Sequence, residues 1–206
     1  MNVLLLNGSP HERGCTYTAL SEVARTLEAD GVSAEILWLG RDAGIGCSGC
    51  GACAKLGKCV VDDVVNRAAE RARRCDGLIV GSPVHYAAAS GQVTGVMDRL
   101  FRSAGDALRL KPAAAVVSAR RAGAAAALDQ LNKYFLFNQM PVVSSRYWNI
   151  VYGAKAEDVL QDGEGLATMR TLAHNMAWLL KSLQAGREAG VEPPVQEPPV
   201  KTNFIR

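Results

Sequence analysis

Four cysteines lie close together in the first third of the chain, and their spacing is the most specific chemical signal in the sequence. The first three follow one another at every third residue, and five residues separate the third from the fourth. Thiolates at this density are the ligand set of a [4Fe–4S] cluster, and the spacing lets all four surround one compact site. Three glycines among them allow the chain to curl so that its amides face the sulfurs. We therefore predict that one [4Fe–4S] cluster is ligated by Cys47, Cys50, Cys53 and Cys59.

Two other uses of these cysteines are open. Structural zinc sites usually combine two Cys-x2-Cys pairs across a longer arm, which this run does not do. A chain that had lost its cluster would keep free thiols or a disulfide here. The N-terminal residues lack a basic segment and a cleavage site, so no secretory signal is visible and we expect a reducing, cytoplasmic location. Of the remaining cysteines, Cys15 and Cys75 are expected to serve in packing.

Composition predicts one folded domain rather than a disordered or strongly charged chain. The 206 residues are 49% hydrophobic and 21% charged, with a formal net charge of +3. That charge is too small to predict binding to nucleic acid or to an anionic membrane. The longest apolar runs fall far short of the roughly 20 residues that a membrane-spanning helix needs. We therefore expect neither a nucleic-acid nor a membrane partner.

Strand and helix patterns alternate along the chain, which predicts a parallel sheet with right-handed crossovers. Apolar runs between turn residues predict five strands: Val3–Leu6, Val32–Leu39, Leu78–Val80, Ala113–Val117 and Val142–Ser145. Helical spacing predicts five helices: Thr16–Asp30, Asp62 or Asp63 to Arg74, Ser90–Ser103, Ala124–Asn138 and Ala156–Ala185. The pattern favours an α/β, flavodoxin-like, doubly wound five-stranded sheet of order 2-1-3-4-5. A Rossmann dinucleotide fold is the competitor, and residues 8–14 lack its Gly-x-Gly-x-x-Gly motif.

Two segments fall outside this alternation. Residues 40–61 form a Cys-rich insertion after the second strand, and residues 187–206 form an extended C-terminal tail with two Pro-Pro pairs. Residues 1–186 are the predicted domain. Phe204 and Ile205 are natural anchors for an apolar groove, so we expect the tail to help hold a homo-oligomer together.

Three loops at the carboxyl ends of strands have side chains suited to a flat, phosphorylated ligand. The loop Ser9–Thr18 has hydroxyls and opens directly into a helix, which suits a phosphate monoester. The loop after Val80 has the aromatic Tyr86, and the loop Ser118–Gly123 has two arginines. Taken singly, these residues could equally be helix caps, turn residues or solvated charges. Their gathering at one sheet edge favours a binding site.

The motifs resemble a known family. Asn-Gly-Ser-Pro-x5-Thr follows the first strand, Gly-Ser-Pro-Val-x-Tyr follows the third, and Gly95–Arg99 lies in the next helix. Together they resemble the NAD(P)H-dependent FMN reductases of flavodoxin-like fold, over residues 2–150. The resemblance implies an FMN phosphate surrounded by Ser9, His11, Cys15, Thr16 and Tyr17. It implies an isoalloxazine bordered by Pro83, Val84, His85, Tyr86, Ser118, Arg120, Arg121 and Gly123. Many relatives have a basic residue in place of His11 and Asn in place of Cys15.

The cysteines and their position after the second strand resemble the iron–sulfur flavoprotein branch of that family. This resemblance implies FMN plus one cluster, electron transfer between them, and homo-oligomers (a dimer or tetramer) in which one subunit's cluster approaches another's flavin. The sequence has no second nucleotide motif, so NAD(P)H as donor, and ferredoxin or a small-molecule acceptor as redox partner, are open. The alternatives are a cluster-free NAD(P)H-dependent FMN or quinone reductase and a non-enzymatic electron carrier. Flavodoxins tend to be markedly acidic, and the charge of +3 disfavours the carrier.

Overall fold

The computed structural model describes residues 1–41, 45–198, 200, 202 and 204. Its sheet has five parallel strands in the order β2-β1-β3-β5-β6, and the two-residue strand β4 pairs antiparallel with β3. Counting only the parallel strands, this is the predicted order 2-1-3-4-5. The strands are β1 (Asn2–Asn7), β2 (Ser33–Trp38), β3 (Gly77–His85), β4 (Ala88–Ala89), β5 (Ala113–Ala119) and β6 (Ile150–Tyr152).

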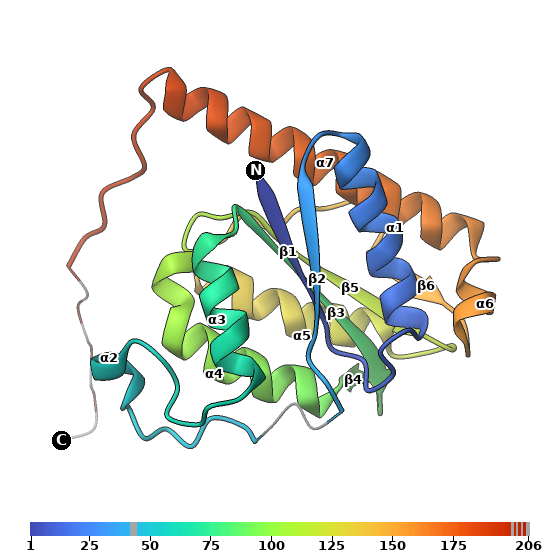
Figure 1. Cartoon of the computed structure of the whole chain (residues 1–206), viewed down its shortest axis with the longest axis horizontal. Coiled ribbons are helices and arrows are strands. Elements are labelled where there is room, and N and C mark those ends of the chain that lie inside the picture. The colour runs from blue at the N-terminus through green and yellow to red at the C-terminus, as the bar shows by residue number, and fades with distance from the viewer. Residues whose placement is uncertain (42–44, 199, 201, 203, 205–206) are drawn as a thin grey trace.

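Helices cover both faces of the sheet (Figure 1). On one face lie α3 (Val64–Arg74), α4 (Gly91–Leu108) and α5 (Ala124–Phe137), and on the other lie α1 (Cys15–Ala29) and α7 (Gly163–Glu188). Two single-turn helices, α2 (Cys53–Leu56) and α6 (Ala156–Val159), complete the structure. A parallel sheet covered on both faces explains why the predicted strands are short runs of consecutive apolar residues.

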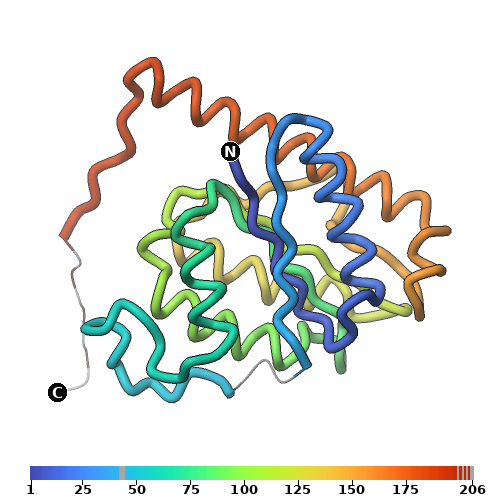
Figure 2. The backbone as a smooth tube through the Cα atoms, viewed as in Figure 1, coloured from blue at the N-terminus to red at the C-terminus, as the bar shows by residue number. Residues whose placement is uncertain are grey.

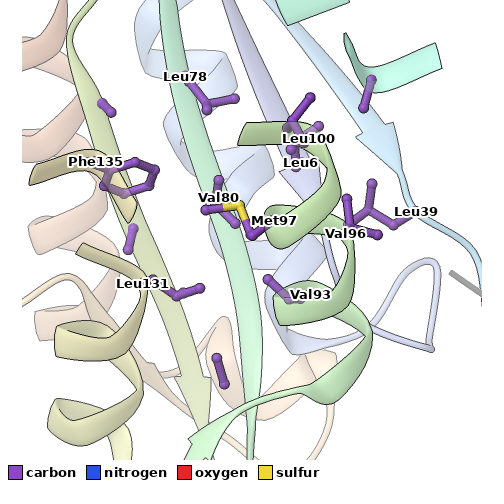
Figure 3. Packing of buried hydrophobic residues seen from close by; sticks show 14 of the residues in the cluster. Leu6, Leu39, Leu78, Val80, Val93, Val96, Met97, Leu100, Leu131 and Phe135 are labelled. Atoms are coloured by element: carbon purple, nitrogen blue, oxygen red, sulfur yellow. The ribbon is translucent and has the colours of Figure 1, made fainter. Parts of the chain in front are cut away.

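The two faces of the sheet bury separate cores because successive strand residues point to opposite sides. In β1, Leu4 and Leu6 pack on the α4 side, whereas Val3 and Leu5 pack on the α1 side. Figure 3 shows the first of these cores, where Met97 of α4 lies against the sheet. Cys75 belongs to the same core and is 2% exposed, as predicted.

The predicted fifth strand is wrong in its position. Val142 makes only an isolated bridge to Ala113, and the strand that continues the sheet is β6, whose residues pair with Val117–Ala119. The physical reason lies in α7. The Ser144 carbonyl accepts a hydrogen bond from Asn175 at 2.8 Å, and the Ser145 hydroxyl donates to a carbonyl of α7 at 2.7 Å. These bonds hold the segment against the helix, and the ladder resumes only at Ile150.

The predicted helix Ala156–Ala185 is two helices, α6 and α7. The first ends at Val159, and Asp162 caps the second: its carboxylate accepts hydrogen bonds from the Gly165 amide at 2.9 Å and from the Tyr152 amide in β6 at 2.7 Å. The other predicted helices match the structure to within a few residues, with α4 continuing beyond Ser103 to Leu108. None of the helices in the described ranges is both long and apolar enough to cross a membrane.

The C-terminal tail leaves the domain after α7 ends at Glu188 (Figure 2). Its described residues are exposed, with Val195 at 96% and Phe204 at 91%. Ile205, the other anchor predicted for this tail, lies outside the described residues.

Candidate functional site

The two Gly-Ser-Pro motifs meet at the carboxyl edge of the sheet. Asn7 at the end of β1 pairs with Gly81 in β3, and the Gly8 amide donates to the Gly81 carbonyl at 2.9 Å. A Cβ atom at Gly8 would lie 1.9 Å from Val93 Cγ2, so only glycine fits between β3 and α4. This close approach brings the first two predicted loops side by side.

The backbone of the first loop is fixed by hydrogen bonds within the loop and by the side chains of Asn7 and Trp38. The sequence analysis assigned no role to either side chain. Asn7 accepts a hydrogen bond from the Ser9 amide at 3.2 Å and donates to the Glu12 carbonyl at 2.8 Å. The Trp38 indole N–H donates to the Ser9 carbonyl at 2.8 Å. The Ser9 hydroxyl is buried and accepts from the His11 amide at 3.1 Å, while the His11 side chain is exposed. These hydrogen bonds fix the backbone of the loop in one conformation.

Helix α1 begins at this loop without a side-chain cap. Its N-cap residue is Gly14, and the first intrahelical amide bond is from Thr18 to the Gly14 carbonyl. Across the part of the chain that the structure describes, the amides of Cys15, Thr16 and Tyr17 have no acceptor. Three other helices are capped by side chains, those of Asp63, Ser90 and Asp162. Free amides at a helix N-terminus suit an anion.

Thr16 is predicted to contact the phosphate and Ser118 the isoalloxazine, but in the structure the two side chains lie together. Their hydroxyl oxygens are 2.8 Å apart, and the residues are 1% and 4% exposed. Beside them the Cys15 thiol donates to the Gly153 carbonyl at 3.5 Å, and burial raises the pKa of Cys15. The thiol thus stays protonated and serves in packing, although it is only half-buried. The half-buried Tyr17 ring has the Arg13 guanidinium 5.5 Å from its centre.

The second and third loops touch each other. Gly123 lies so close to the second loop that an added Cβ would be 2.6 Å from the Ala87 Cα. Tyr86 and Ala87 have positive φ angles of 51° and 60°, a strained conformation for these residue types, and the Tyr86 side chain is fully exposed. The strand predicted to end at Val80 continues as β3 to His85, because its last residues pair with β4 and β5. Of the other residues predicted for the ring, Pro83 and Val84 are half-buried and His85 is exposed at this end of β3, while Arg120 and Arg121 are exposed on the third loop.

The four cysteines of the predicted cluster line one small cavity of about 30 Å³ beside α4, and we call them the cysteine cage: Cys47, Cys50, Cys53 and Cys59. The glycines between them have φ angles of 70°, 71° and 65°, so the chain curls as predicted. The Ala52 amide, hydrogen-bonded to the thiolate, lowers the pKa of Cys50. Residues 42–44, which belong to the predicted insertion, lie outside the described residues.

Two cysteines of the cage are held by helices. The Cys53 thiol, at the start of α2, donates to the Arg102 carbonyl at 3.6 Å. The Cys59 amide and carbonyl both bond to the Asn66 side chain, at 2.9 and 3.0 Å, and the Arg99 guanidinium donates to the Cys59 sulfur at 3.3 Å. The other two cysteines lie on an exposed loop.

Thiolates are ligands of both zinc and iron–sulfur clusters, so the residue types of the cage fit either group. All six cysteines are free, and the four of the cage surround one space. Within residues 1–41 and 45–198, no three His, Cys, Asp or Glu side chains are placed to hold one metal ion.

A groove that the sequence analysis missed adjoins the cage between α4 and α5. It has a volume of about 720 Å³, and its walls include Cys47, Phe101 and Phe137. Tyr134 in its wall donates to the Asp98 carboxylate at 2.5 Å. Burial and this carboxylate raise the pKa of Tyr134 well above its ordinary value.

The sheet order and the loops at its carboxyl edge define a flavodoxin-like protein. The family model described as NADPH-dependent FMN reductase matches residues 1–155, so the chain belongs to that family of flavin-dependent oxidoreductases, as the resemblance implied. Within the family it belongs with the iron–sulfur flavoproteins. One of these, from Methanocaldococcus jannaschii, is 30% identical over 192 residues, covering 89% of this chain and 100% of the relative. Another, from Methanosarcina thermophila, is 25% identical over 194 residues, covering 91% and 100%.

Solved structures show the same fold at low sequence identity. RosB with a bound 8-demethyl-8-formylriboflavin-5′-phosphate intermediate is 15% identical with a TM-score of 0.70, covering 100% of this chain and 92% of RosB. An archaeal flavodoxin is 13% identical with a TM-score of 0.60, covering 88% of this chain and 99% of the flavodoxin. These likenesses establish the fold.

Proposed function

We propose that this FMN-dependent oxidoreductase also binds one [4Fe–4S] cluster through the cysteine cage. Bound FMN would supply two-electron chemistry and the cluster one-electron transfer. The observation that carries the proposal is that four free cysteines, from a loop and two helix-anchored positions, line a single cavity. The names of the relatives support it.

The FMN phosphate is proposed to lie at the N-terminus of α1. The free amides of Cys15, Thr16 and Tyr17 would donate to it, and Ser9 and His11 complete that end of the site. The Ser9 hydroxyl already accepts a hydrogen bond from the His11 amide, so binding of the phosphate requires little rearrangement of the backbone.

The isoalloxazine is proposed to lie over the second and third loops. The exposed Tyr86 ring offers an aromatic surface, and the exposed Arg120 and Arg121 offer positive charge near a reduced, anionic ring. Neighbouring side chains of both loops complete the border: Pro83, Val84, His85, Ser118 and Gly123.

A pyridine nucleotide is the proposed electron donor, and ferredoxin or a small molecule is the proposed acceptor. The family description supports the donor. Cluster chemistry needs reduced thiols, so we place the protein in the cytoplasm.

We also propose that the chain works as a homo-oligomer, held in part by its tail. The exposure of the tail's large apolar side chains, Val195, Val200 and Phe204, supports this use.

Iron and acid-labile sulfide analysis of anaerobically purified protein tests the cluster. We expect about four irons per chain, with loss of iron and of the cluster's share of the visible absorption in Cys59→Ala, while the absorption of bound FMN remains. Cys75→Ala is the matched control, because Cys75 lies in the core and outside the cage. Fresh wild-type protein without iron or sulfide, but with FMN and NAD(P)H turnover, would instead favour a cluster-free FMN or quinone reductase.

A further inference from the structure

Arg99 is a buried cation beside the cysteine cage. It lies in α4, its side chain is 2% exposed, and its guanidinium forms two hydrogen bonds with the Asp63 carboxylate, at 2.7 and 3.0 Å. Arg99 Nη2 also donates to the Val61 carbonyl at 3.1 Å, and Nη1 also donates to the Ile45 carbonyl at 3.4 Å. The remaining donor, Nε–H, bonds to the Cys59 sulfur at 3.3 Å. Every nitrogen of the guanidinium therefore donates at least one hydrogen bond.

The pairing with Asp63 leaves the guanidinium little freedom. Asp63 is itself fixed as the N-cap of α3, where its carboxylate accepts from the Val65 amide at 2.9 Å. A planar guanidinium with a two-point carboxylate contact has a set orientation. The direction of Nε–H toward Cys59 is thus set mainly by the packing of α3 against α4, and the bonds to the Ile45 and Val61 carbonyls of the loop agree with it.

We propose that Arg99 is a positioning residue that holds the Cys59 sulfur and raises the reduction potential of the cluster. The inference rests on the proposed function, in which Cys59 is a ligand. Reduction adds one electron, and therefore one negative charge, to the cluster and its thiolates. A hydrogen bond to a ligand sulfur and a nearby positive charge both favour the more negative, reduced state, so the potential rises. The Asp63 carboxylate offsets much of the guanidinium charge, so the hydrogen bond from Nε–H to the ligand sulfur carries most of the effect.

Arg102 provides a matched comparison. It lies one turn further along α4, lines the same cavity and has the same charge. Its side chain is exposed and, within the described residues, makes no hydrogen bond to sulfur, whereas its backbone carbonyl, which substitution leaves in place, accepts from the Cys53 thiol. Water screens an exposed charge, so its removal should change the potential much less.

The test is an EPR-monitored redox titration of the anaerobically purified full-length protein, with iron content and circular dichroism measured on each sample. The variants are Arg99→Gln, Arg99→Lys and the control Arg102→Gln. Arg99→Lys keeps a cation in the buried position but lacks the Nε donor, so it keeps the test valid if Arg99→Gln does not fold. We expect Arg99→Lys to disfavour reduction of the cluster about tenfold relative to the control, a shift of about 59 mV to lower potential for a one-electron couple.

Two results would overturn the inference, and they differ in kind. If the wild type contains the cluster and folded Arg99→Lys has the same potential as Arg102→Gln, Arg99 does not set the potential, and the proposed function stands. If the wild type contains no iron, the cluster proposal fails together with the inference.

Discussion

Replacing Thr16 with valine tests whether the hydroxyls of Thr16 and Ser118, at the edge of the proposed flavin site, stabilise the fold by bonding to each other. Thr16 and Ser118 are almost fully buried, and their oxygens are 2.8 Å apart. Valine has nearly the shape of threonine, so the substitution removes a hydroxyl without opening a large cavity. In the apoprotein the Ser118 hydroxyl then lacks its partner.

The magnitude follows from the burial of the pair. A buried hydroxyl left without a partner costs about 1–3 kcal/mol. Thr16→Val and Ser118→Ala should each lower the free energy of unfolding by an amount in that range. The double variant removes both partners, so its loss should be smaller than the sum of the single losses by about 0.5–1.5 kcal/mol.

Urea unfolding of the apoproteins measures this double-mutant cycle. Thr18→Val is the control, because its hydroxyl bonds to the Gly14 carbonyl, which already accepts from the Thr18 amide. Strictly additive losses would refute the pairing. FMN titration of the same variants tests whether the Thr16 hydroxyl donates to the phosphate in addition to the Thr16 amide, since loss of such a charge-assisted bond would weaken FMN binding by about 1.5–3 kcal/mol in Thr16→Val. Affinity equal to that of Thr18→Val would show that the Thr16 hydroxyl does not contact the phosphate, which would leave only the amide in that role.

Three further outcomes are expected. Tyr134 ionises near pH 10 in the unfolded chain but at higher pH in the folded protein, beside Asp98. Its contribution to stability is therefore complete below about pH 10 and is lost as the pH rises above it. In unfolding titrations at increasing pH, Tyr134→Phe should lose stability less steeply than the wild type. An unchanged slope of unfolding free energy against pH would be contrary evidence. Gly8→Ala places Cβ against Val93 and should lower the free energy of unfolding by about 1–3 kcal/mol, with partial recovery on adding Val93→Ala. Deleting residues 192–206 should lower the oligomeric mass in light scattering at low micromolar concentration, and an unchanged mass would refute the role of the tail.

The sheet order could be predicted because it depends on local patterns and a general chirality rule. Runs such as Val3–Leu6 are apolar on both faces, which is typical of a parallel strand, and right-handed crossovers leave few possible orders. The fifth strand could not be placed in this way. The pairs Val142–Val143 and Ile150–Val151 look alike in sequence, and contacts with α7 and the register on β5 decide between them.

The sequence alone determined the chemical character of the two candidate sites. Cysteine spacing defined the cage, and the Gly-Ser-Pro motifs defined the loops, because both depend on residues close together in the chain. Only the tertiary structure revealed that Arg99 donates to Cys59, 40 residues earlier, and that Thr16 bonds to Ser118, 102 residues later. Such contacts depend on how whole helices and strands pack against each other, and that packing is the sum of many weak interactions along the chain. No local pattern encodes which buried donor will meet which acceptor.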